Sequence, residues 1–274
     1  MFKFIHMSDP HLLDGDALLY GISPKDRLEA CFKHIKINHA DAAFVAITGD
    51  IAENGSHGAY CKVHDIAKKA ELIVFVISGN HDNTSNMSLA LPKFNGNLNE
   101  LESGAWMSSY ITHEDRAFIF IDTTSNNSDH GIFDHDKADV LKYNLSSLSA
   151  QDIFLFMHHP PFKVGIPFMD MLCLINHEPL YSALAPFKSK IRHIFIGHLH
   201  KTINGSWRGI PFSIIRSTVH QVSTGINFHN LDTGYRAIVC DETPEYSVIM
   251  VDGDKLVCNA ERFIENFSTF LLYE

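Results

Sequence analysis

Paired cysteines, long apolar runs and an excess of positive charge are all missing from this sequence of 274 residues. Its 5 cysteines form no Cys-x-x-Cys pair, and their odd number and wide spacing do not indicate a disulfide framework. No apolar run approaches the roughly 20 residues that a transmembrane helix needs, and no secretion signal precedes the first apolar segment. We therefore predict a cytoplasmic protein with no membrane partner.

The charge balance of the chain is acidic. Lys and Arg number 22 against 32 Asp and Glu, which gives a net charge of −10 and works against nonspecific affinity for nucleic acid. With 45% hydrophobic residues and no linker or repeat, the chain is long enough to bury a full core as one α/β domain. We predict a single domain over residues 1–274 without a nucleic-acid partner, in which a local positive site has to come from metal ions.

The informative residues are Asp, Asn and His side chains in short blocks. In chain order the blocks are Asp9-Pro10-His11, Gly49-Asp50, Gly79-Asn80-His81-Asp82, His158-His159-Pro160-Pro161 and Gly197-His198-Leu199-His200. Any one of them occurs by chance in many proteins, but the ordered set supplies seven oxygen or nitrogen ligands and a spare histidine. Two adjacent divalent metal ions require a ligand set of this kind.

A short apolar run ends directly before each block. The runs cover residues 2–7, 43–48, 72–78, 153–157 and 191–196. They are rich in β-branched and aromatic residues, which predicts strands buried on both faces. Helical segments between the runs predict largely parallel sheets with helices outside, and in such sheets ligands bind beyond the carboxyl ends of the strands. The blocks are therefore expected to converge on one site.

The helices and the C-terminal part have recognisable signals. The clearest helix begins after Ser23, which is expected to cap the first turn, with Pro24 at the first helical position. Further helices are expected over residues 60–70, 136–148 and 179–187. In residues 212–274, short strand-like runs separated by turns predict a mainly antiparallel completion of the second sheet.

The ligand chemistry favours catalysis over a structural role. Carboxylate and imidazole ligands without thiolate suit Mn, Fe, Co or Zn and do not suit a structural zinc knot. Two such cations about 3.5–4 Å apart can hold a hydroxide as nucleophile and polarise a phosphoryl group. A carboxylate or a water has to bridge them. Asp50 is the natural bridge, because Gly49 before it permits a close approach at the end of a central strand.

From Asp9 to His200 the ordered blocks resemble those of the calcineurin-like metallophosphoesterase family. The resemblance implies a four-layer α/β/β/α sandwich of two mixed sheets flanked by helices. It also implies two metal ions, the first held by Asp9, His11, Asp50 and His200 and the second by Asp50, Asn80, His158 and His198. His81 is then not a ligand, and we expect it to contact the phosphate and to protonate the leaving alkoxide.

Departures from the sequence patterns of two subfamilies narrow the range of expected substrates. Asp50 is followed by Ile51-Ala52-Glu53-Asn54, without the Asp-Arg-Gly of the family's protein serine/threonine phosphatases. The third block ends in Asp82, where those phosphatases have Glu. Repair nucleases of the family share Gly-Asn-His-Asp, but they need a basic track for DNA that a net charge of −10 argues against.

The remaining resemblance is to bacterial cyclic-nucleotide phosphodiesterases and glycerophosphodiesterases. The segments that carry it are Ser8-Asp9-Pro10-His11-Leu12, Leu19-Tyr20-Gly21, residues 156–161 and residues 217–222. We predict a phosphodiesterase that attacks small phosphodiesters with a metal-bound hydroxide, with glycerophosphodiesters ranked ahead of cyclic nucleotides. The predicted substrate-binding residues are Asn80, His81 and His220, and His81 is the predicted catalytic residue. A phosphomonoesterase or nucleotidase on the same site and a non-catalytic metal-binding scaffold are the alternatives.

Three residues near the blocks each keep two interpretations. His220 either faces the substrate or lies on the surface. Tyr20 either lines the pocket or packs in the fold. His159 follows a predicted ligand and precedes two prolines, so we expect it to point away from the metals and to hydrogen-bond the backbone, the alternative being a functional role.

Two longer segments also remain open. Met169, Met171 and Leu172 form either an apolar wall near the metals, or part of a loop that covers the core or contacts another subunit. Residues 83–107, with clusters of Asn, Gly and Ser, form either a surface excursion or an oligomer contact. A homo-oligomer is therefore left open, and the expected partner is a small-molecule phosphodiester.

Overall fold

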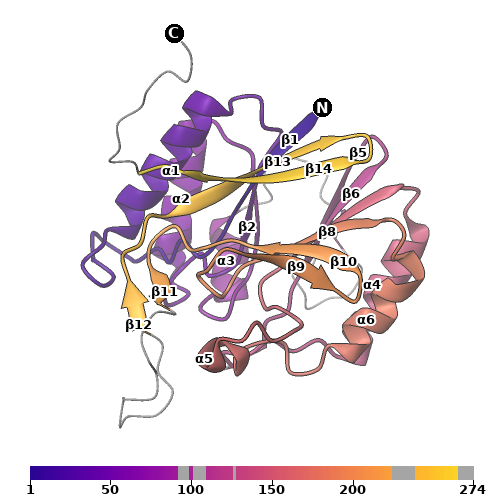
Figure 1. Ribbon diagram of the computed structural model, residues 1–274. Helices are drawn as coiled ribbons and strands as arrows, with labels where there is room; N and C mark the ends of the chain where they lie inside the picture. Colours follow the sequence, from indigo (N-terminus) through magenta and orange to yellow (C-terminus); the bar gives the residue numbers. More distant parts are fainter. Residues whose placement is uncertain (92–98, 101–108, 126–127, 224–237, 265–274) are drawn as a thin grey trace.

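The computed structural model describes residues 1–91, 99–100, 109–125, 128–223 and 238–264, and the structural statements below concern these residues. Two large mixed sheets pack face to face, with helices on both outer faces (Figure 1). The predicted four-layer α/β/β/α sandwich is therefore confirmed. No helix of the described ranges combines the length and the apolar character needed to cross a membrane.

The first sheet has the strand order β14-β13-β1-β2-β3. Its strands are β1 (Phe2–Met7), β2 (Val45–Thr48), β3 (Val74–Ile77), β13 (Glu245–Asp252) and β14 (Lys255–Arg262). Strands β1, β2 and β3 are parallel, so their carboxyl ends lie at the same edge. This edge carries the first three blocks.

The second sheet has the order β4-β5-β6-β7-β8-β10-β9. Its strands are β4 (Asn99–Glu100), β5 (Ser109–His113), β6 (Arg116–Ile121), β7 (Asp152–Met157), β8 (Ile191–Ile196), β9 (Ile203–Trp207) and β10 (Ile210–Ile214). Strands β6, β7, β8 and β10 are parallel, and the last two blocks follow β7 and β8. A separate pair, β11 (Gln221–Ser223) and β12 (Ile238–Cys240), is antiparallel.

The prediction that residues 212–274 complete the second sheet is wrong for β13 and β14. Strand β13 pairs antiparallel with β1 of the first sheet, placing Phe2 opposite Val251. The sequence pattern does not distinguish the two sheets here, because β13 is buried on both faces. Val248 packs toward the helices of the first sheet, whereas Ile249 and Val251 face the second sheet. Among the described strands, β10 is the one that places part of residues 212–274 in the second sheet, and it pairs with β8 in parallel and not in the predicted antiparallel direction.

Helices α1 (Pro24–Asn38) and α2 (His57–Ala70) cover the outer face of the first sheet (Figure 1). The Ser23 hydroxyl accepts a hydrogen bond from the Asp26 amide at 3.2 Å, which confirms the predicted cap. Ser56 caps α2 in the same way, so this helix begins three residues before the predicted Tyr60.

The second sheet is covered by α4 (His135–Ser147) and α6 (Glu178–Leu184), the latter continued by a 3₁₀ turn, η1 (Ala185–Phe187) (Figure 1). Two shorter helices, α3 (Thr84–Ala90) and α5 (Pro167–Asp170), lie after the third and fourth blocks. Beyond α3, residues 92–98 and 101–108 lie outside the described residues, and with them most of the 83–107 segment.

An aromatic layer fills the space between the two sheets. Phe4 of β1 stacks on Phe44 with ring centroids 5.1 Å apart and meets Phe118 and Phe195 of the second sheet edge-on at 5.5 Å. All four rings are buried, and pairs in these geometries contribute beyond the area they bury. The layer fixes the distance between the sheets, and so between the blocks that each sheet carries.

Phe4→Ala should lower the free energy of unfolding by about 3–5 kcal/mol, because it leaves a cavity where several rings meet. Phe4→Leu, which keeps most of the volume, should cost less than about 1.5 kcal/mol. Urea denaturation with a chelator present measures both values without a metal contribution. Equal losses for the two variants would contradict this account of the layer.

Candidate metal centre

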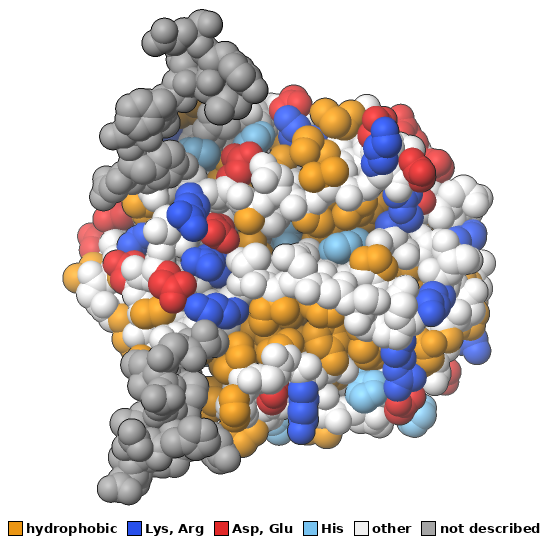
Figure 2. Space-filling model, in the orientation of Figure 1, with side chains coloured by type: hydrophobic (Ala, Val, Ile, Leu, Met, Phe, Trp, Pro, Cys, Tyr) orange, Lys and Arg blue, Asp and Glu red, His pale blue; other side chains and the backbone are white. Residues whose placement is uncertain are grey.

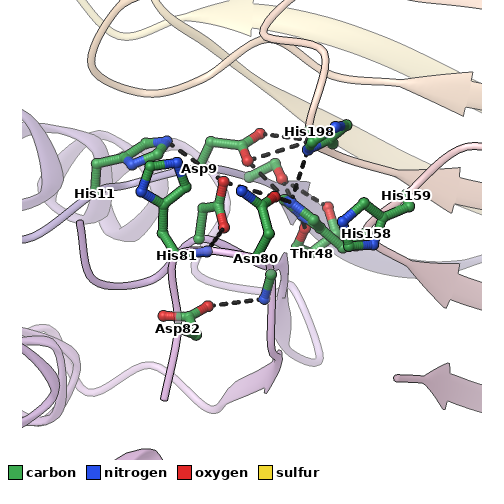
Figure 3. A network of polar contacts seen from close by, with 12 residues as sticks. Asp9, His11, Thr48, Asn80, His81, Asp82, His158, His159 and His198 are labelled. Atoms are coloured by element: carbon green, nitrogen blue, oxygen red, sulfur yellow. Dashed lines mark hydrogen bonds and ion pairs between the residues drawn. The ribbon is translucent and has the colours of Figure 1, made fainter. Parts of the chain in front are cut away.

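The five blocks meet where the two sheets open at the carboxyl ends of their parallel strands (Figure 3). Several ligand candidates sit at positive φ: Asp9 at 54°, His11 at 43° and Asp50 at 48°. His198 at 71° and His200 at 48° share this left-handed conformation. It is strained for residues with a side chain, and such strain concentrates at functional sites.

Glycines make the close approach possible. A Cβ atom on Gly49 would lie 2.2 Å from His158 Nδ1, and one on Gly79 would lie 2.2 Å from Asp50 Oδ1. A Cβ atom on Gly197 would lie 2.0 Å from Ser8 Oγ. The glycines that precede three of the blocks are therefore required where neighbouring strand ends touch.

The first cluster comprises Asp9, His11, Asp50 and His200, whose candidate ligand atoms lie within 4.8 Å of one another. The Nε2 atoms of His11 and His200 are 3.1 Å apart. His11 Nε2 lies 3.8 Å from Asp50 Oδ2, and His200 Nε2 lies 3.8 Å from Asp9 Oδ1. These are the four residues that the resemblance assigns to one metal.

Outer partners fix which ring nitrogen of each histidine carries the proton. His11 Nδ1 lies 2.7 Å from the Glu53 carboxylate, and His200 Nδ1 lies 3.0 Å from the carbonyl oxygen of His220. Both Nδ1 atoms therefore donate, which leaves the Nε2 lone pairs facing each other. Two facing lone pairs 3.1 Å apart need a positive charge between them.

The second cluster forms around His158 Nε2. This atom lies 3.1 Å from Asn80 Oδ1, 3.1 Å from His198 Nδ1 and 3.4 Å from Asp50 Oδ2. His158 Nδ1 donates to the Thr48 carbonyl oxygen at 2.7 Å, so its Nε2 again offers a lone pair. Asp50 contributes to both clusters, as expected of a bridging carboxylate.

The electrostatics of the centre favour cations. Burial alone would lower the pKa of His158, but the carboxylates of Asp50 and Asp9 raise it to about 9. Burial raises the pKa of Asp9 to about 7, while burial lowers that of His198 to about 3 and keeps this imidazole neutral. Carboxylates and neutral imidazoles converge here with too few hydrogen-bond donors between them. Such a set of groups is suited to bind two divalent metal ions.

His159 also lies within reach of His158 and His198, and the three together could hold an ion. Its Nδ1 atom, however, is 2.8 Å from the hydroxyl of Thr123, so that atom is already engaged. The predicted ligand Asn80 places its Oδ1 atom 3.1 Å from His158 Nε2. The structure therefore brings all seven predicted ligands together and turns one ring nitrogen of His159 to another element.

His81 lies at the edge of the clusters and not inside them (Figure 3). Its amide donates to Asp50 Oδ1 at 3.0 Å, and its Nδ1 donates to the Glu53 carbonyl oxygen at 2.8 Å. The ring is 38% exposed and borders a cavity, so its remaining nitrogen, Nε2, is free to meet a ligand there. This placement agrees with the predicted role, which stays a prediction.

A cavity of about 440 Å³ opens over the clusters. Its lining combines polar and charged side chains with a mainly apolar set, formed by Tyr20, Phe168, Met169, Leu172, Val222 and Val239. Of the two interpretations of this stretch, the structure favours the apolar wall for Met169 and Leu172, whereas Met171 is 56% exposed and is not among the described lining residues.

His220 and Tyr20 both border this cavity. The His220 ring is 7% exposed and lies 4.4 Å from the ring of His200 and 5.0 Å from that of Tyr20. The hydroxyl of Ser217 donates to the Asp9 carbonyl oxygen at 2.7 Å and ties the His220 segment to the first block. Of the two interpretations of His220, the structure therefore favours the one at the cavity.

A model of the calcineurin-like phosphoesterase family matches residues 2–202. The chain belongs to the calcineurin-like phosphoesterase family. Members of this family depend on two metal ions, and the two clusters form the corresponding candidate site. The assignment of each ligand to a metal remains a prediction.

The chain is also similar to several known bacterial proteins. It is 30% identical to a probable cyclic nucleotide phosphodiesterase of Rhodopseudomonas palustris, over 99% of this chain and 96% of that protein. It is 27% identical to a probable glycerophosphodiester phosphodiesterase of Arcobacter nitrofigilis, over 80% of this chain and 79% of the relative. A dimetal phosphatase from Danio rerio, with 14% identity, shares the fold at a TM-score of 0.67 over 96% and 97% of the two chains.

Asp82 is a supporting residue to which the sequence analysis gave no role. Its carboxylate accepts hydrogen bonds from the amides of Ile51 at 3.0 Å, Ala52 at 2.9 Å and Gly79 at 2.9 Å. It also accepts one from the Tyr60 hydroxyl at 2.9 Å. One partly buried side chain thus joins the turn that carries Asp50 to the turn that carries Asn80 and His81. Its place at the end of the third block was the available signal.

Glu53 is a second residue that was missed. Its carboxylate orients His11, and its carbonyl oxygen orients His81. In the sequence Glu53 served only to set the chain apart from protein phosphatases. It has no spacing that would reveal these contacts.

Asp82→Asn should lower the free energy of unfolding by about 2–4 kcal/mol, because an amide group would face buried N–H donors that lose their acceptor. Tyr60→Phe removes only the hydroxyl and should cost about 1 kcal/mol. Denaturant titration of both metal-free variants gives the comparison. If Asp82→Asn were as mild as Tyr60→Phe, Asp82 would not be the link between the two turns.

Proposed function

We propose that the chain is a dinuclear metal-dependent phosphodiesterase that hydrolyses small phosphodiesters, either glycerophosphodiesters or cyclic nucleotides. The observation that carries this proposal is the pair of ligand clusters that share Asp50 at the lining of a cavity. Relatives named as phosphodiesterases of these two classes support it.

The first metal would be held by Asp9, His11, Asp50 and His200, and the second by Asp50, Asn80, His158 and His198. When bound, two such ions supply a lowered water pKa and charge stabilisation for in-line displacement at phosphorus. The ligand types favour Mn, Fe, Co or Zn. Because all five cysteines are free thiols, we also propose a cytoplasmic location.

The charges around the cavity favour a diester over a monoester. Among the described residues that line it there is no Lys or Arg, whereas Glu53 and Asp129 are acidic. A diester carries one negative charge, which the metal centre can neutralise, but a monoester near neutral pH carries close to two. Lys and Arg side chains are also interspersed with Asp and Glu over the face shown in Figure 2, a distribution that does not suit a nucleic-acid track.

The chain's own residues would orient the substrate and deliver the proton. Asn80 and His81 lie where the phosphate would approach the clusters, and His220 faces the same cavity. With Nδ1 held by the Glu53 carbonyl oxygen, His81 can present a protonated Nε2 to the leaving oxygen. The apolar wall would receive one of the two alcohol groups.

Purified protein loaded with Mn or Co should cleave bis(p-nitrophenyl) phosphate with a higher kcat/KM than p-nitrophenyl phosphate. The reason is that the described residues lining the cavity include no Lys or Arg, so the metal ions alone would neutralise the phosphate. A panel of glycerophosphodiesters and of 2′,3′- and 3′,5′-cyclic nucleotides then identifies the substrate class. The reverse ranking of the two nitrophenyl esters would favour a phosphomonoesterase or nucleotidase, and no cleavage of any ester would favour a scaffold.

His81→Ala should retain both metals and lose a factor of about 10²–10⁴ in kcat on substrates with alkoxide leaving groups. The loss should shrink for p-nitrophenolate, which leaves without a proton. His57→Ala, at an exposed position of α2, is the matched control and should behave as the unaltered protein. An equal loss for both leaving groups would assign His81 to phosphate positioning instead.

A further inference from the structure

The segment between the first block and α1 carries an exposed aromatic residue to the cavity over the metal centre. It begins after Leu12, which is fully buried and whose amide donates to the Ile51 carbonyl oxygen at 2.9 Å. It ends at Ile22, which is 8% exposed and directly precedes the Ser23 cap of α1. Between these fixed ends, Tyr20 is 63% exposed and lines the cavity. Its ring is therefore held at the cavity by a segment that is anchored at both ends.

Tyr20 occupies a strained backbone position. Leu19 and Ile22 exchange two backbone hydrogen bonds, of 2.8 and 2.9 Å, around a two-residue turn. Both residues of this turn have positive φ, 52° at Tyr20 and 82° at Gly21. Turns of this type favour glycine and asparagine, and a bulky aromatic residue in the left-handed region is an outlier. Because such outliers cluster at functional sites, the strain indicates a role for the side chain.

Lys62 of α2 holds the same segment from the side. Its Nζ atom donates to the carbonyl oxygen of Leu13 at 2.7 Å and to that of Gly15. Asp14 lies against the first turn of this helix, since a Cβ atom on Gly58 would be 2.1 Å from Asp14 Oδ1. An ammonium group that satisfies two carbonyl oxygens fixes the path of the backbone that leads to the strained turn.

The neighbours of the Tyr20 ring indicate which part of a substrate it meets. The ring lies edge-on to that of His220, with centroids 5.0 Å apart. His11 contacts both His220 and His81, at 5.1 and 5.0 Å between ring centroids. Within the described residues, Tyr20 has this ring contact with His220 and none with His81. Because His81 is the proposed donor to the leaving oxygen, Tyr20 is placed for the alcohol group that stays on the phosphate.

We propose that Tyr20 is a specificity-determining residue, whose ring packs on the retained alcohol group and favours an aromatic ring there. This inference rests on the proposed phosphodiesterase activity. Packing between aromatic faces needs no hydrogen bond and tolerates many ring types. Lys62 is a positioning residue, which acts on the substrate only through the segment that carries Tyr20.

Two diesters with the same leaving group test the role of Tyr20. Bis(p-nitrophenyl) phosphate and methyl p-nitrophenyl phosphate both release p-nitrophenolate, and they differ only in the retained group, which is aryl or methyl. In protein loaded with Mn or Co, Tyr20→Ala should lower the ratio of their kcat/KM values, aryl over methyl, by about tenfold. The change should lie mainly in KM for the aryl ester. Tyr20→Phe keeps the ring and should keep most of the preference, and Tyr143→Ala, at a 66% exposed position of α4, is the matched control.

A double-mutant cycle tests the role of Lys62. Lys62→Met removes the ammonium group and should lower the same ratio, whereas Lys62→Arg should recover most of it. In the Tyr20→Ala background, Lys62→Met should have no further effect on the ratio, because its effect passes through the Tyr20 ring.

The possible failures have separate meanings. If the unaltered protein cleaves both esters and Tyr20→Ala leaves their ratio unchanged, the ring does not select the retained alcohol group. Additive effects of Lys62→Met and Tyr20→Ala on the ratio would overturn the positioning role of Lys62. If the unaltered protein cleaves neither ester, the proposed function fails, and this inference fails with it.

Discussion

The structure depends on one constraint at its centre. Carboxylates and the lone pairs of imidazole nitrogens are held close together, with too few hydrogen-bond donors to satisfy them. Asp50 is the centre of this arrangement, since its Oδ2 atom lies 3.8 Å from His11 and 3.4 Å from His158. Asp50 and His158 are buried, so the mutual repulsion is screened less than it would be in water. The high pKa of His158 and of Asp9 expresses the same demand for positive charge. Two cations meet that demand.

The fold holds this arrangement in place at some cost. Asp9, His11, Asp50, His198 and His200 adopt left-handed backbone conformations, each worth roughly 1–2 kcal/mol of strain. The aromatic layer between the sheets and the hydrogen bonds of Asp82 oppose relaxation of the strand ends. Packing in the core thus keeps the ligands close before any ion binds, and cations in turn stabilise the fold.

Much of the site was predictable because each ligand lies next in sequence to the strand that positions it. Each ligand directly follows a strand, and parallel strands end at a shared edge, so strand ends alone predict convergence. The position of β13 was not predictable in this way. A strand that is apolar on both faces fits the open edge of either sheet, and only packing of Val248 and Ile249 decides for the first.

The hydrogen bonds that support the ligands could not be predicted from the sequence either. Asp82 and Glu53 act through hydrogen bonds to groups about 30 and 40 residues away, and no spacing rule reports such contacts. Nor does the sequence show that Asn80 Oδ1 lies 3.1 Å from His158 Nε2, or that His159 Nδ1 meets the Thr123 hydroxyl. Residue type predicted the metal chemistry, whereas tertiary contacts determine which atoms point inward.

Metal content per chain in Asp50→Ala and Asn80→Ala is the most direct test of the shared carboxylate. Asp50→Ala should lose both ions, because each cluster loses a ligand and the two lose their bridge, whereas Asn80→Ala should mainly weaken the second ion. Asp139→Ala, at an exposed position of α4, is the matched carboxylate control and should keep two ions. Two tightly bound ions in Asp50→Ala would contradict the central role of this carboxylate.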